Sequence, residues 1–522
     1  MKWFFKIMLP ALVLVSCSKE SGSPMDPGSV STTRNGVVAH DEIVLGKKLD
    51  NPYSIENVRN ALRSLYPTRG ATEIDPNGLY VRFLPANSEQ LDQLASLGLE
   101  MFDHPLDYEI LRDGDYYHDR SLPEDQITWQ YTIVPPDFSF PSGIDHEILE
   151  ECFVPDEEIP TRGFEEVDWN HVEKEAFRRT GNEALILPDT RGNRTYPKGR
   201  ITIEDEQSKG EKIFGVAGVK VKTQVFVRIS SAYTDKDGNY EIRMKYSAKP
   251  HYRLVFKNTC DFSIGFNLIL SPASTSSLGK GSPLGMDVKI DKDSDGTLFR
   301  RCVVNNAAYD YISKCKEMGI SAPPKNLRIW IFKQMRPSSA LMLHHGAVLN
   351  QDAIDKFLGL YRYLIRVILP DITIGARDRD DYASLYGATV HEMAHASHFQ
   401  QVGSTYWDKY ITYVLTAYAS TGATYGDGSG ADAGYCEVGE MWAYYLENKL
   451  YKSRYGYSQE SGYGLWFYPQ IFAQLEEEGI DISDLFSALR SDVNDRDALL
   501  KKLTEICPSM KSVITRIFKS YT

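Results

Sequence analysis

The chain has 522 residues, of which 42% are hydrophobic and 25% are charged, a balance that argues against a disordered or fibrous protein. This length predicts about two to four domains. The formal net charge is −13, and lysine and arginine form no basic stripe. We therefore expect no nucleic-acid partner, because binding to phosphates needs clustered positive charge.

The first residues have the pattern of a secretory signal. Lys2 and Lys6 give a positive start, and residues 7–15 form an apolar run that is too short to cross a bilayer. Residues 1–16 are therefore predicted to be a signal peptide. The run ends in LVSC, which resembles the lipoprotein box of bacterial lipoproteins, where the cysteine, here Cys17, is lipidated and becomes the new N-terminus. The alternative is an ordinary secretory peptide that happens to be followed by a cysteine.

Residues 17–39 are small, polar and rich in glycine and proline, as expected for a flexible tether. A diacylated Cys17 would hold the protein on a membrane without a transmembrane helix. The sequence SKE at 18–20 resembles the export signal of surface lipoproteins in Bacteroidetes. This resemblance implies a lipoprotein on the outer membrane or cell surface of a Gram-negative bacterium.

The remaining cysteines define neither a metal site nor one disulfide pattern. No Cys-x-x-Cys pair occurs, which argues against a structural zinc bound by cysteines. In an exported protein these residues could form disulfides, but buried free thiols are also compatible with so few cysteines in a long chain. They are Cys152, Cys260, Cys302, Cys315, Cys436 and Cys507.

Residues 40–160 are predicted to form a small α/β accessory domain. It begins with a helix whose first residue is capped by Ser54. A strand at 79–85, a helix at 88–98 and a second strand at 99–102 then predict a β-α-β unit. The role of this region, and whether it is removed as a pro-region, stays open.

Residues 161–197 are predicted to be a helical linker, with a helix capped by Asp168. From 198 to 275, short alternating runs between Gly and Asp turns predict an antiparallel β-sandwich. Within it, GVAGVKV at 215–221 and TDKDGNY at 234–240 resemble the carboxypeptidase regulatory-like domain, a transthyretin-like sandwich common in Bacteroidetes surface proteins. The resemblance implies a spacer or adhesion module, to which we assign no chemistry.

An acidic segment after the sandwich matches half of a calcium loop. The run from Asp291 to Asp295, followed by a glycine, has the pattern D-x-D-x-D-G, but Cys302 stands at the twelfth position, where a bidentate glutamate is needed. The flanking segments DVKI and TLFRRCVV alternate like strands. We interpret the segment as a charged hairpin turn, with calcium binding as the less favoured alternative.

Residues 276–522 mix strand and helix patterns and are predicted to form an α+β catalytic domain. The expected elements are strands at 327–332 and 372–375 and helices at 353–369, from Asp380 or Asp381 to 399, and at 434–451. Together with the regions before it, this domain predicts a multidomain α+β fold.

The motif HEMAH at 391–395 is the strongest chemical signal. The chain has 11 histidines, and chance gives on the order of 0.02 such motifs in a chain like this one. On a helix, His391 and His395 lie one turn apart on one face, so both imidazoles can reach one metal ion. Glu392 cannot ligate from its position and would act as a general base. The motif resembles that of zincin metallopeptidases, which implies a zincin-like C-terminal domain.

The third ligand decides the subclass. Metzincins place a glycine and a further ligand after the second histidine, where this chain has His398 and Gln401. Gluzincins take a glutamate from a following helix, and EMWAYY at 440–445 resembles that segment. The resemblance implies Glu440 as the third ligand, with Glu437, one turn earlier, as the alternative. The linker before this helix is longer than the commonest gluzincin spacing and contains an inserted helix and a glycine-rich loop.

This pattern predicts Zn²⁺ as the cofactor of a hydrolase, a zinc metalloendopeptidase. Two imidazoles and a carboxylate leave a fourth position for water. The substrates would be extracellular proteins or glycoproteins, and Tyr435, Tyr444 and Tyr445 are candidates for stabilising the oxyanion. The alternative is a binding or scaffolding lipoprotein with a vestigial zincin domain, against which the retained Glu392 argues.

Three further histidines are given no catalytic role. His398 is expected to pack behind the metal ligands. His344 and His345 follow a predicted strand and are interpreted as turn or wall residues, with substrate contact as the alternative.

Overall fold

The computed structural model describes most of the chain. The described residues are 42–67, 74–123, 126–155, 167–187, 195–266, 271, 273–347 and 369–521. The signal peptide 1–16, the lipidation site Cys17, the tether 17–39 and nearly all of the helix expected at 353–369 lie outside them and stay predictions. The described part combines several β-sheets with helices, which confirms the expected mixed α+β class.

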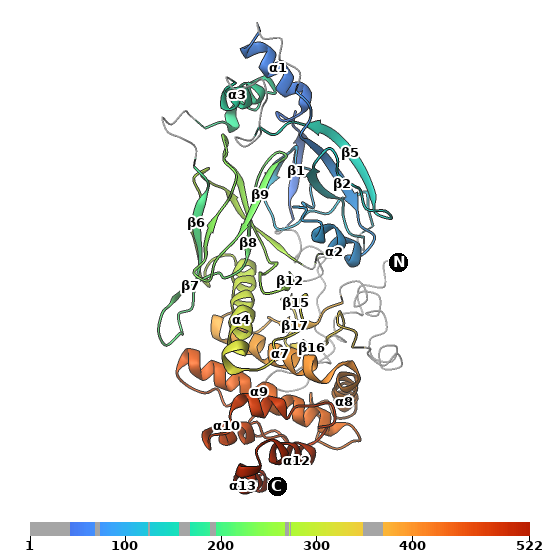
Figure 1. The fold of residues 1–522 in the computed structure, drawn as a ribbon, viewed down its shortest axis with the longest axis vertical. Helices are drawn as coiled ribbons and strands as arrows, with labels where there is room; N and C mark the ends of the chain where they lie inside the picture. Colours follow the sequence, from blue (N-terminus) through green and yellow to red (C-terminus); the bar gives the residue numbers. More distant parts are fainter. Residues whose placement is uncertain are drawn as a thin grey trace.

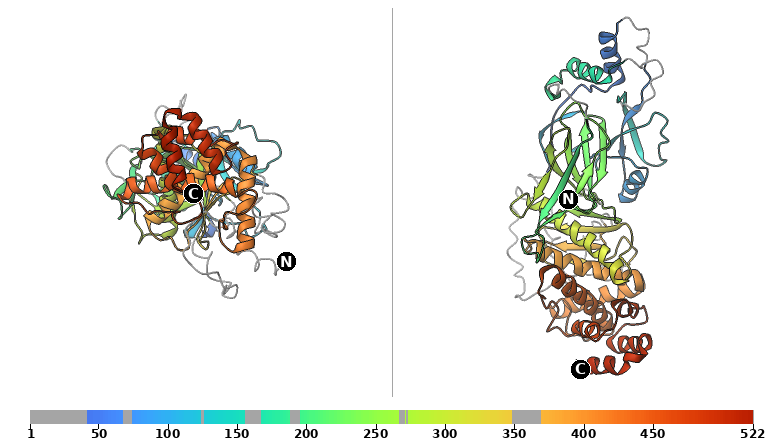
Figure 2. Two further views of the ribbon diagram at one scale, coloured as in Figure 1. Left: turned by 90° about the horizontal axis from the view of Figure 1, so that it is seen from below. Right: turned by 60° about the vertical axis from the view of Figure 1, so that its left-hand side comes forward.

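The molecule is elongated, and its parts follow one another along the long axis (Figure 1). Helices α1 (Ile55–Leu65) and α3 (Trp169–Arg179) lie at one end, the β-sheets occupy the middle, and the C-terminal helices form the other end. The turned view in Figure 2 keeps this order. The HExxH helix therefore lies among the C-terminal helices, well away from the N-terminal accessory part.

Residues 42–187 form a small antiparallel sheet, a two-stranded pair and short helices. The elements are β1 (Val44–Lys48), α1 (Ile55–Leu65), β2 (Gly78–Leu84), α2 (Ser88–Ser96), β3 (Tyr108–Arg112), β4 (Gln130–Val134), β5 (Asp145–Cys152) and α3 (Trp169–Arg179). α1 and α3 begin where predicted, because the side chains of Ser54 and Asp168 accept hydrogen bonds from backbone N–H groups of the first turn.

The expected β-α-β unit is wrong. β2 lies at the centre of the order β4-β2-β5 and pairs antiparallel with both neighbours. Residues 99–102 form no strand and contribute a single bridge, between Phe102 and Tyr131. Both edges of β2 are already occupied, so the short run after α2 has no edge of that strand to join.

Residues 195–290 form two sheets with a common core and supply one strand, β12, to a third sheet. The strands are β6 (Lys198–Glu204), β7 (Ile213–Gly215), β8 (Lys220–Val225), β9 (Arg228–Tyr233), β10 (Asn239–Glu241), β11 (His251–Val255), β12 (Phe262–Phe266), β13 (Thr275–Lys280) and β14 (Val288–Ile290). One sheet has the order β10-β6-β14 with β7 beside β6, and the other has the order β13-β11-β8-β9. Tyr240 packs inward, and Gly238 has a φ of +83° in the turn before it, a conformation that favours glycine.

These sheets do not divide at the expected boundary after residue 275. β12 pairs parallel with β15 (Leu327–Phe332) of the C-terminal sheet, whereas β13 and β14 return to the two earlier sheets. β14 also pairs parallel with β6, so the sandwich is not purely antiparallel. Because the chain crosses between the two parts more than once, they share one continuous hydrophobic core.

The acidic segment is a helix cap, and its interpretation as a hairpin turn is wrong. Residues 297–304, expected as a strand, belong to α4 (Gly296–Met318). The Asp295 side chain accepts hydrogen bonds from the backbone N–H groups of Thr297 and Leu298 at 2.7 and 3.3 Å. Asp291 accepts hydrogen bonds from the N–H of Asp293 and the hydroxyl of Ser294. Buried residues occur all round the first half of α4, so its sequence lacks a one-sided helical pattern.

The C-terminal part places helices around a four-stranded sheet with the order β12-β15-β17-β16. Its other elements are β16 (Ser339–Ala340), β17 (Ile372–Gly375), α7 (Tyr382–Val402), α8 (Ser404–Thr421), α9 (Ala433–Tyr455), α10 (Gln470–Glu477), α11 (Ile482–Ser487), α12 (Arg496–Ile506) and α13 (Lys511–Lys519). The predicted strands at 327–332 and 372–375 are confirmed. α7 packs against α4, α9 and the β16–β17 edge. Among the described helices, none is both long and apolar enough to span a membrane.

The described cysteines are all free thiols. Cys152, Cys302, Cys315 and Cys436 are buried and pack in the hydrophobic core. The sequence left open whether these cysteines form disulfides or stay free thiols. In the described part of the chain they are free thiols.

Candidate metal centre

Two packed helices bring the candidate ligands together. α7 begins after Asp381, whose side chain accepts the N–H of Ser384, and then runs through the HExxH motif. Its spacing puts the ring centroids of His391 and His395 4.8 Å apart, one turn from each other. α9 packs along α7 and contributes Glu440. These two histidines and the glutamate form a buried cluster that could hold a metal ion.

The donor atoms have the separations that a tetrahedral metal site requires. Nε2 of His391 lies 3.2 Å from Nε2 of His395 and 3.4 Å from Oε2 of Glu440. Oε1 of Glu440 lies 3.4 Å from Nε2 of His395. Bonds of about 2.0–2.1 Å to a tetrahedral zinc ion put neighbouring donors roughly 3.3–3.4 Å apart. The two histidine nitrogens thus have nearly this separation, and each lies at a similar distance from one oxygen of Glu440. No fourth side chain in the described chain joins them.

Further polar groups orient the ligands. Nδ1 of His391 lies 3.0 Å from a carboxylate oxygen of Glu447, and the Ser461 hydroxyl donates to the other oxygen at 2.7 Å. The Tyr410 hydroxyl donates to Oε1 of Glu440 at 2.6 Å. A carboxylate on the far nitrogen of a ligating histidine fixes its tautomer and raises its basicity. Neither Glu447 nor Tyr410 was expected from the sequence, although Glu447 lies two turns after Glu440 on the same face of α9.

The charged groups in the cluster strongly shift one another's pKa values. Burial alone would lower the pKa of His391, but hydrogen bonds with Glu440 and Glu447 outweigh burial and raise that pKa. Burial alone would raise the pKa of Glu440, but the charge of His395 and hydrogen bonds with both histidines lower it. A metal ion that binds here would therefore have to displace any proton that His391 carries between these carboxylates.

Glu392 lies beside the cluster without belonging to it. Its side chain is fully buried, and neither carboxylate oxygen has a hydrogen-bond partner among the described residues. Burial raises its pKa well above the usual range, although the charges of His391 and Arg379 act in the opposite direction. A buried carboxyl group with a raised pKa beside a metal cluster has the properties of a general acid or base.

The alternative third ligand, Glu437, has a different neighbour. One of its oxygens accepts a hydrogen bond from the backbone N–H of Arg496 at 3.2 Å. The other lies 3.4 Å from Nε of the same arginine. Glu437 lies three residues before Glu440 on α9, and of the two only Glu440 belongs to the cluster with the histidines.

The three candidate tyrosines have different surroundings. Tyr435 accepts a hydrogen bond from Lys409 at 3.0 Å, and Tyr445 donates one to a glutamate of α10 at 2.8 Å. The ring of Tyr444, by contrast, lies 4.4 Å from the ring of His391. Tyr444 is therefore the candidate that the structure places at the metal cluster.

The other histidines do not join the cluster. His398 is fully buried, its ring lies 5.8 Å from that of Trp407, and burial lowers its pKa to about 3. His344 and His345 lie beside the start of β17, where Nδ1 of His345 is 3.0 Å from Asp371. His398 thus lies where a packing residue is expected, and His344 and His345 lie where turn or wall residues are expected.

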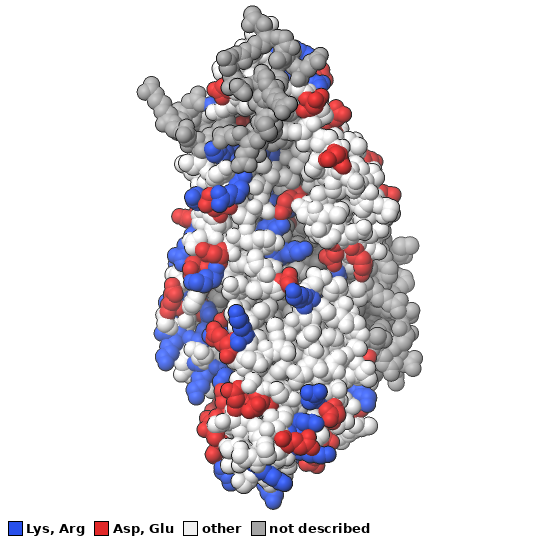
Figure 3. Space-filling view, viewed as in Figure 1, with Lys and Arg blue, Asp and Glu red and all other residues white. Residues whose placement is uncertain are grey.

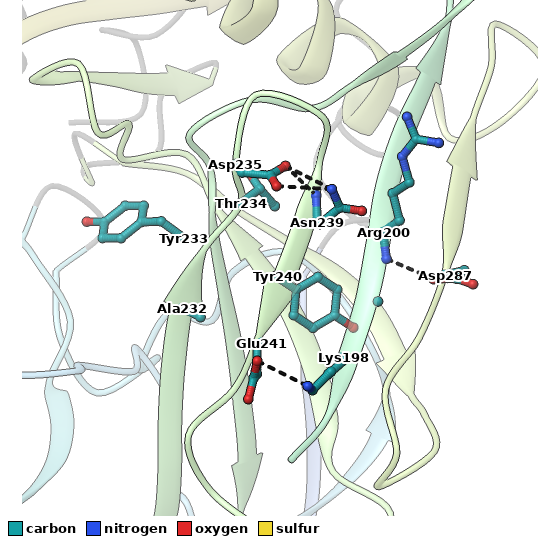
Figure 4. Close-up of a pocket in the computed structure, with 11 residues that line it drawn as sticks. Lys198, Arg200, Ala232, Tyr233, Thr234, Asp235, Asn239, Tyr240, Glu241 and Asp287 are labelled. Atoms are coloured by element: carbon teal, nitrogen blue, oxygen red, sulfur yellow. Dashed lines mark hydrogen bonds and ion pairs between the residues drawn. The ribbon is translucent and has the colours of Figure 1, made fainter. Parts of the chain in front are cut away.

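A shallow groove of about 740 Å³ lies on the sandwich, between β6, β9 and β10 (Figure 4). Several of its polar side chains already pair with each other: Lys198 lies 3.2 Å from Glu241, and Asp235 accepts a hydrogen bond from Asn239 at 3.0 Å. We therefore assign it no ligand. Over the face drawn in Figure 3, acidic and basic side chains are intermixed.

Comparison with known proteins identifies no family. No protein-family model, no curated protein and no solved structure matches this chain. The resemblance to zincins therefore depends on the motif residues and on the geometry of the cluster.

Proposed function

We propose that this chain is a zinc-dependent metallopeptidase of the gluzincin type, with Glu392 as its general base. The observation that carries the proposal is the set of donor separations, 3.2, 3.4 and 3.4 Å, in the buried cluster of His391, His395 and Glu440. A binding protein with a vestigial site has no need for these separations, nor for a buried carboxylate next to them.

In the proposed mechanism the two histidines and Glu440 would hold the ion, and Glu447 and Tyr410 would keep these ligands in place. Zinc bound there would lower the pKa of a water molecule toward about 7 and polarise the scissile carbonyl. Glu392 accepts a proton from the attacking water and delivers it to the leaving amine. Tyr444 is the nearest of the candidate tyrosines for stabilising developing negative charge.

The proposed domain arrangement follows the sequence resemblances. Residues 40–160 would form an accessory domain and 161–197 a helical linker. The carboxypeptidase regulatory-like spacer would comprise the strands between 198 and 290 other than β12. The zincin-like catalytic domain would comprise β12 and the elements from α4 onward. Lipidation at Cys17 would hold the enzyme on the outer membrane or cell surface of a Gram-negative bacterium. Its substrates would then be extracellular proteins or glycoproteins.

The proposal is tested by adding and removing the metal. Protein loaded with one zinc per chain should cleave a mixture of denatured proteins and glycoproteins, and a chelator should abolish cleavage until zinc is restored. The readout is the appearance of new N-termini, compared between the loaded and the chelated protein. Cleavage that survives full removal of zinc would contradict the zinc-dependent mechanism, whereas no cleavage by the loaded protein would favour the scaffolding alternative.

The lipid anchor gives a separate prediction. Cys17→Ala should move the expressed protein from the membrane fraction into the soluble fraction, because residues 7–15 are too short to span a bilayer. The measurement is the distribution of the protein after ultracentrifugation, with Cys507→Ala as a control that leaves the anchor intact. A Cys17→Ala protein that still sediments with membranes would rule out the lipoprotein interpretation.

A further inference from the structure

The N-terminal part of the chain, residues 42–187, supplies carboxylates to buried cations of the rest of the protein. Arg301, in α4, has 1% of its side chain exposed and lies 2.5 Å from Asp115. Arg328, in β15, is equally buried and lies 2.6 Å from Asp92. In both pairs the acidic residue belongs to the N-terminal part and the basic residue comes later in the chain.

Three strands of the sandwich have ion pairs with the same direction of charge. In each of them less than a tenth of the basic side chain is exposed, and a charge taken out of water is costly without a counter-ion. Burial raises the pKa of Glu100, but the charges of Lys222 and Lys220 lower it to about 2, so this carboxylate is ionised at neutral pH. The three pairs are Lys222 of β8 with Glu100 at 3.4 Å, Arg228 of β9 with Glu173 at 3.4 Å, and Arg253 of β11 with Asp113 at 3.2 Å.

The same boundary is also apolar. β1, β2 and β5 lie alongside the sandwich strands (Figure 1). The core that the sandwich shares with the C-terminal part includes Tyr80 of β2 and Phe177 of α3. The ring centroid of Phe177 lies 5.8 Å from that of Phe226, at the end of β8. Removal of residues 42–187 would therefore expose apolar surface as well as unpaired cations, and a large exposed apolar patch favours aggregation.

The metal cluster takes its described contacts from other parts of the chain. α7 and α9 supply the ligands, Tyr410 comes from α8, and Ser461, which donates to Glu447, follows α9. The five ion pairs reach β8, β9, β11, α4 and β15 instead. An inhibitory pro-region has to cover the site that it blocks, whereas these contacts hold the N-terminal part against the sandwich, α4 and β15.

We propose that residues 42–187 are a permanent part of the working protein and are not a pro-region that is removed. The two most deeply buried arginines connect this part to elements that support the HExxH helix. The Tyr311 hydroxyl of α4 donates to Ser397 of α7 at 2.9 Å, and β15 pairs with β17, the strand that precedes α7. The inference depends on these contacts alone, so it goes beyond the proposed peptidase activity and does not require it.

The first test is to cut the chain between the two parts. A site for a specific protease is inserted between residues 190 and 191 of the full-length protein, and the cut protein is analysed by size-exclusion chromatography and circular dichroism. The two pieces should elute together with an unchanged spectrum. Separation of the N-terminal piece from a remaining piece that stays folded and monomeric would overturn the inference. So would a mature protein, isolated from the cells that make it, whose intact mass lacks residues 42–187.

A matched pair of variants on α3 tests whether the ion pairs hold the two parts together. Glu173→Gln leaves the buried Arg228 without its counter-ion, so the two pieces of the cut protein should dissociate at least about 10-fold faster than in the wild type. Glu175→Gln is the control, because Glu175 pairs with Arg178 and Arg179 of its own helix. Equal dissociation rates in the two variants would overturn the inference. Zinc binding and peptide cleavage, which test the proposed peptidase, are measured separately.

Discussion

Glu440→Ala is expected to lose zinc and peptidase activity together. Glu440 supplies one of three donor groups, and its oxygens lie 3.4 Å from a nitrogen of each histidine. Without it, His391 and His395 remain, which are too few protein ligands for a stable catalytic zinc. The measurement is zinc per chain after dialysis, with circular dichroism to show that the fold is kept.

The matched control is Glu437→Ala, the same substitution one turn earlier on α9. Glu437 bonds to Arg496 and not to the histidines, so this variant should keep its zinc and most of its activity. Full zinc in Glu440→Ala with loss in Glu437→Ala would transfer the ligand role to Glu437. Full zinc in both variants would mean that another residue completes the site, and the gluzincin proposal would be wrong.

Glu392→Gln is expected to keep zinc and to lower turnover by at least ~10²-fold. The glutamate lies outside the ligand set, so its loss removes the proton acceptor and leaves the metal bound. Glutamine has almost the same shape, so the buried pocket around residue 392 should stay filled.

The measurement is kcat on a peptide that the wild type cleaves, together with zinc per chain. Glu437→Gln makes the same chemical change at a position away from the metal and should retain near wild-type turnover. Turnover near that of the wild type in Glu392→Gln would exclude the proposed general base. Loss of zinc in this variant would instead make Glu392 a ligand. Comparing Glu440→Ala with Glu392→Gln thus distinguishes the residue that holds the metal, Glu440, from the residue that moves the proton, Glu392.

Local signals in the sequence predicted several elements correctly. The helices after Ser54, Asp168 and Asp381 begin as expected, because a capping side chain and the N–H groups it binds lie within a few residues of each other. The strands at 327–332 and 372–375 are buried apolar runs, and they also follow from local composition. These features need no knowledge of the rest of the fold.

The errors arose where distant segments decide the local structure. Residues 297–304 alternate like a strand, yet they form the start of α4, whose buried residues contact other elements on several sides. Residues 99–102 form no strand, because β4 and β5 already occupy both edges of β2. Burial by other parts of the chain removes the periodicity on which sequence patterns depend.

The candidate metal centre shows the same difference between what the local sequence determines and what the tertiary structure decides. The sequence alone determined that His391 and His395 share a helix face with Glu392 between them, because the helical repeat places residues one turn apart. Only the tertiary structure decided that Glu440 faces these histidines while Glu437 faces Arg496, because that depends on how α9 is rotated against α7. It also brought Tyr410 to the site from α8, where its hydroxyl donates to Glu440. Contacts between segments that are far apart in the chain are set by packing of the whole domain, and no local spacing encodes them.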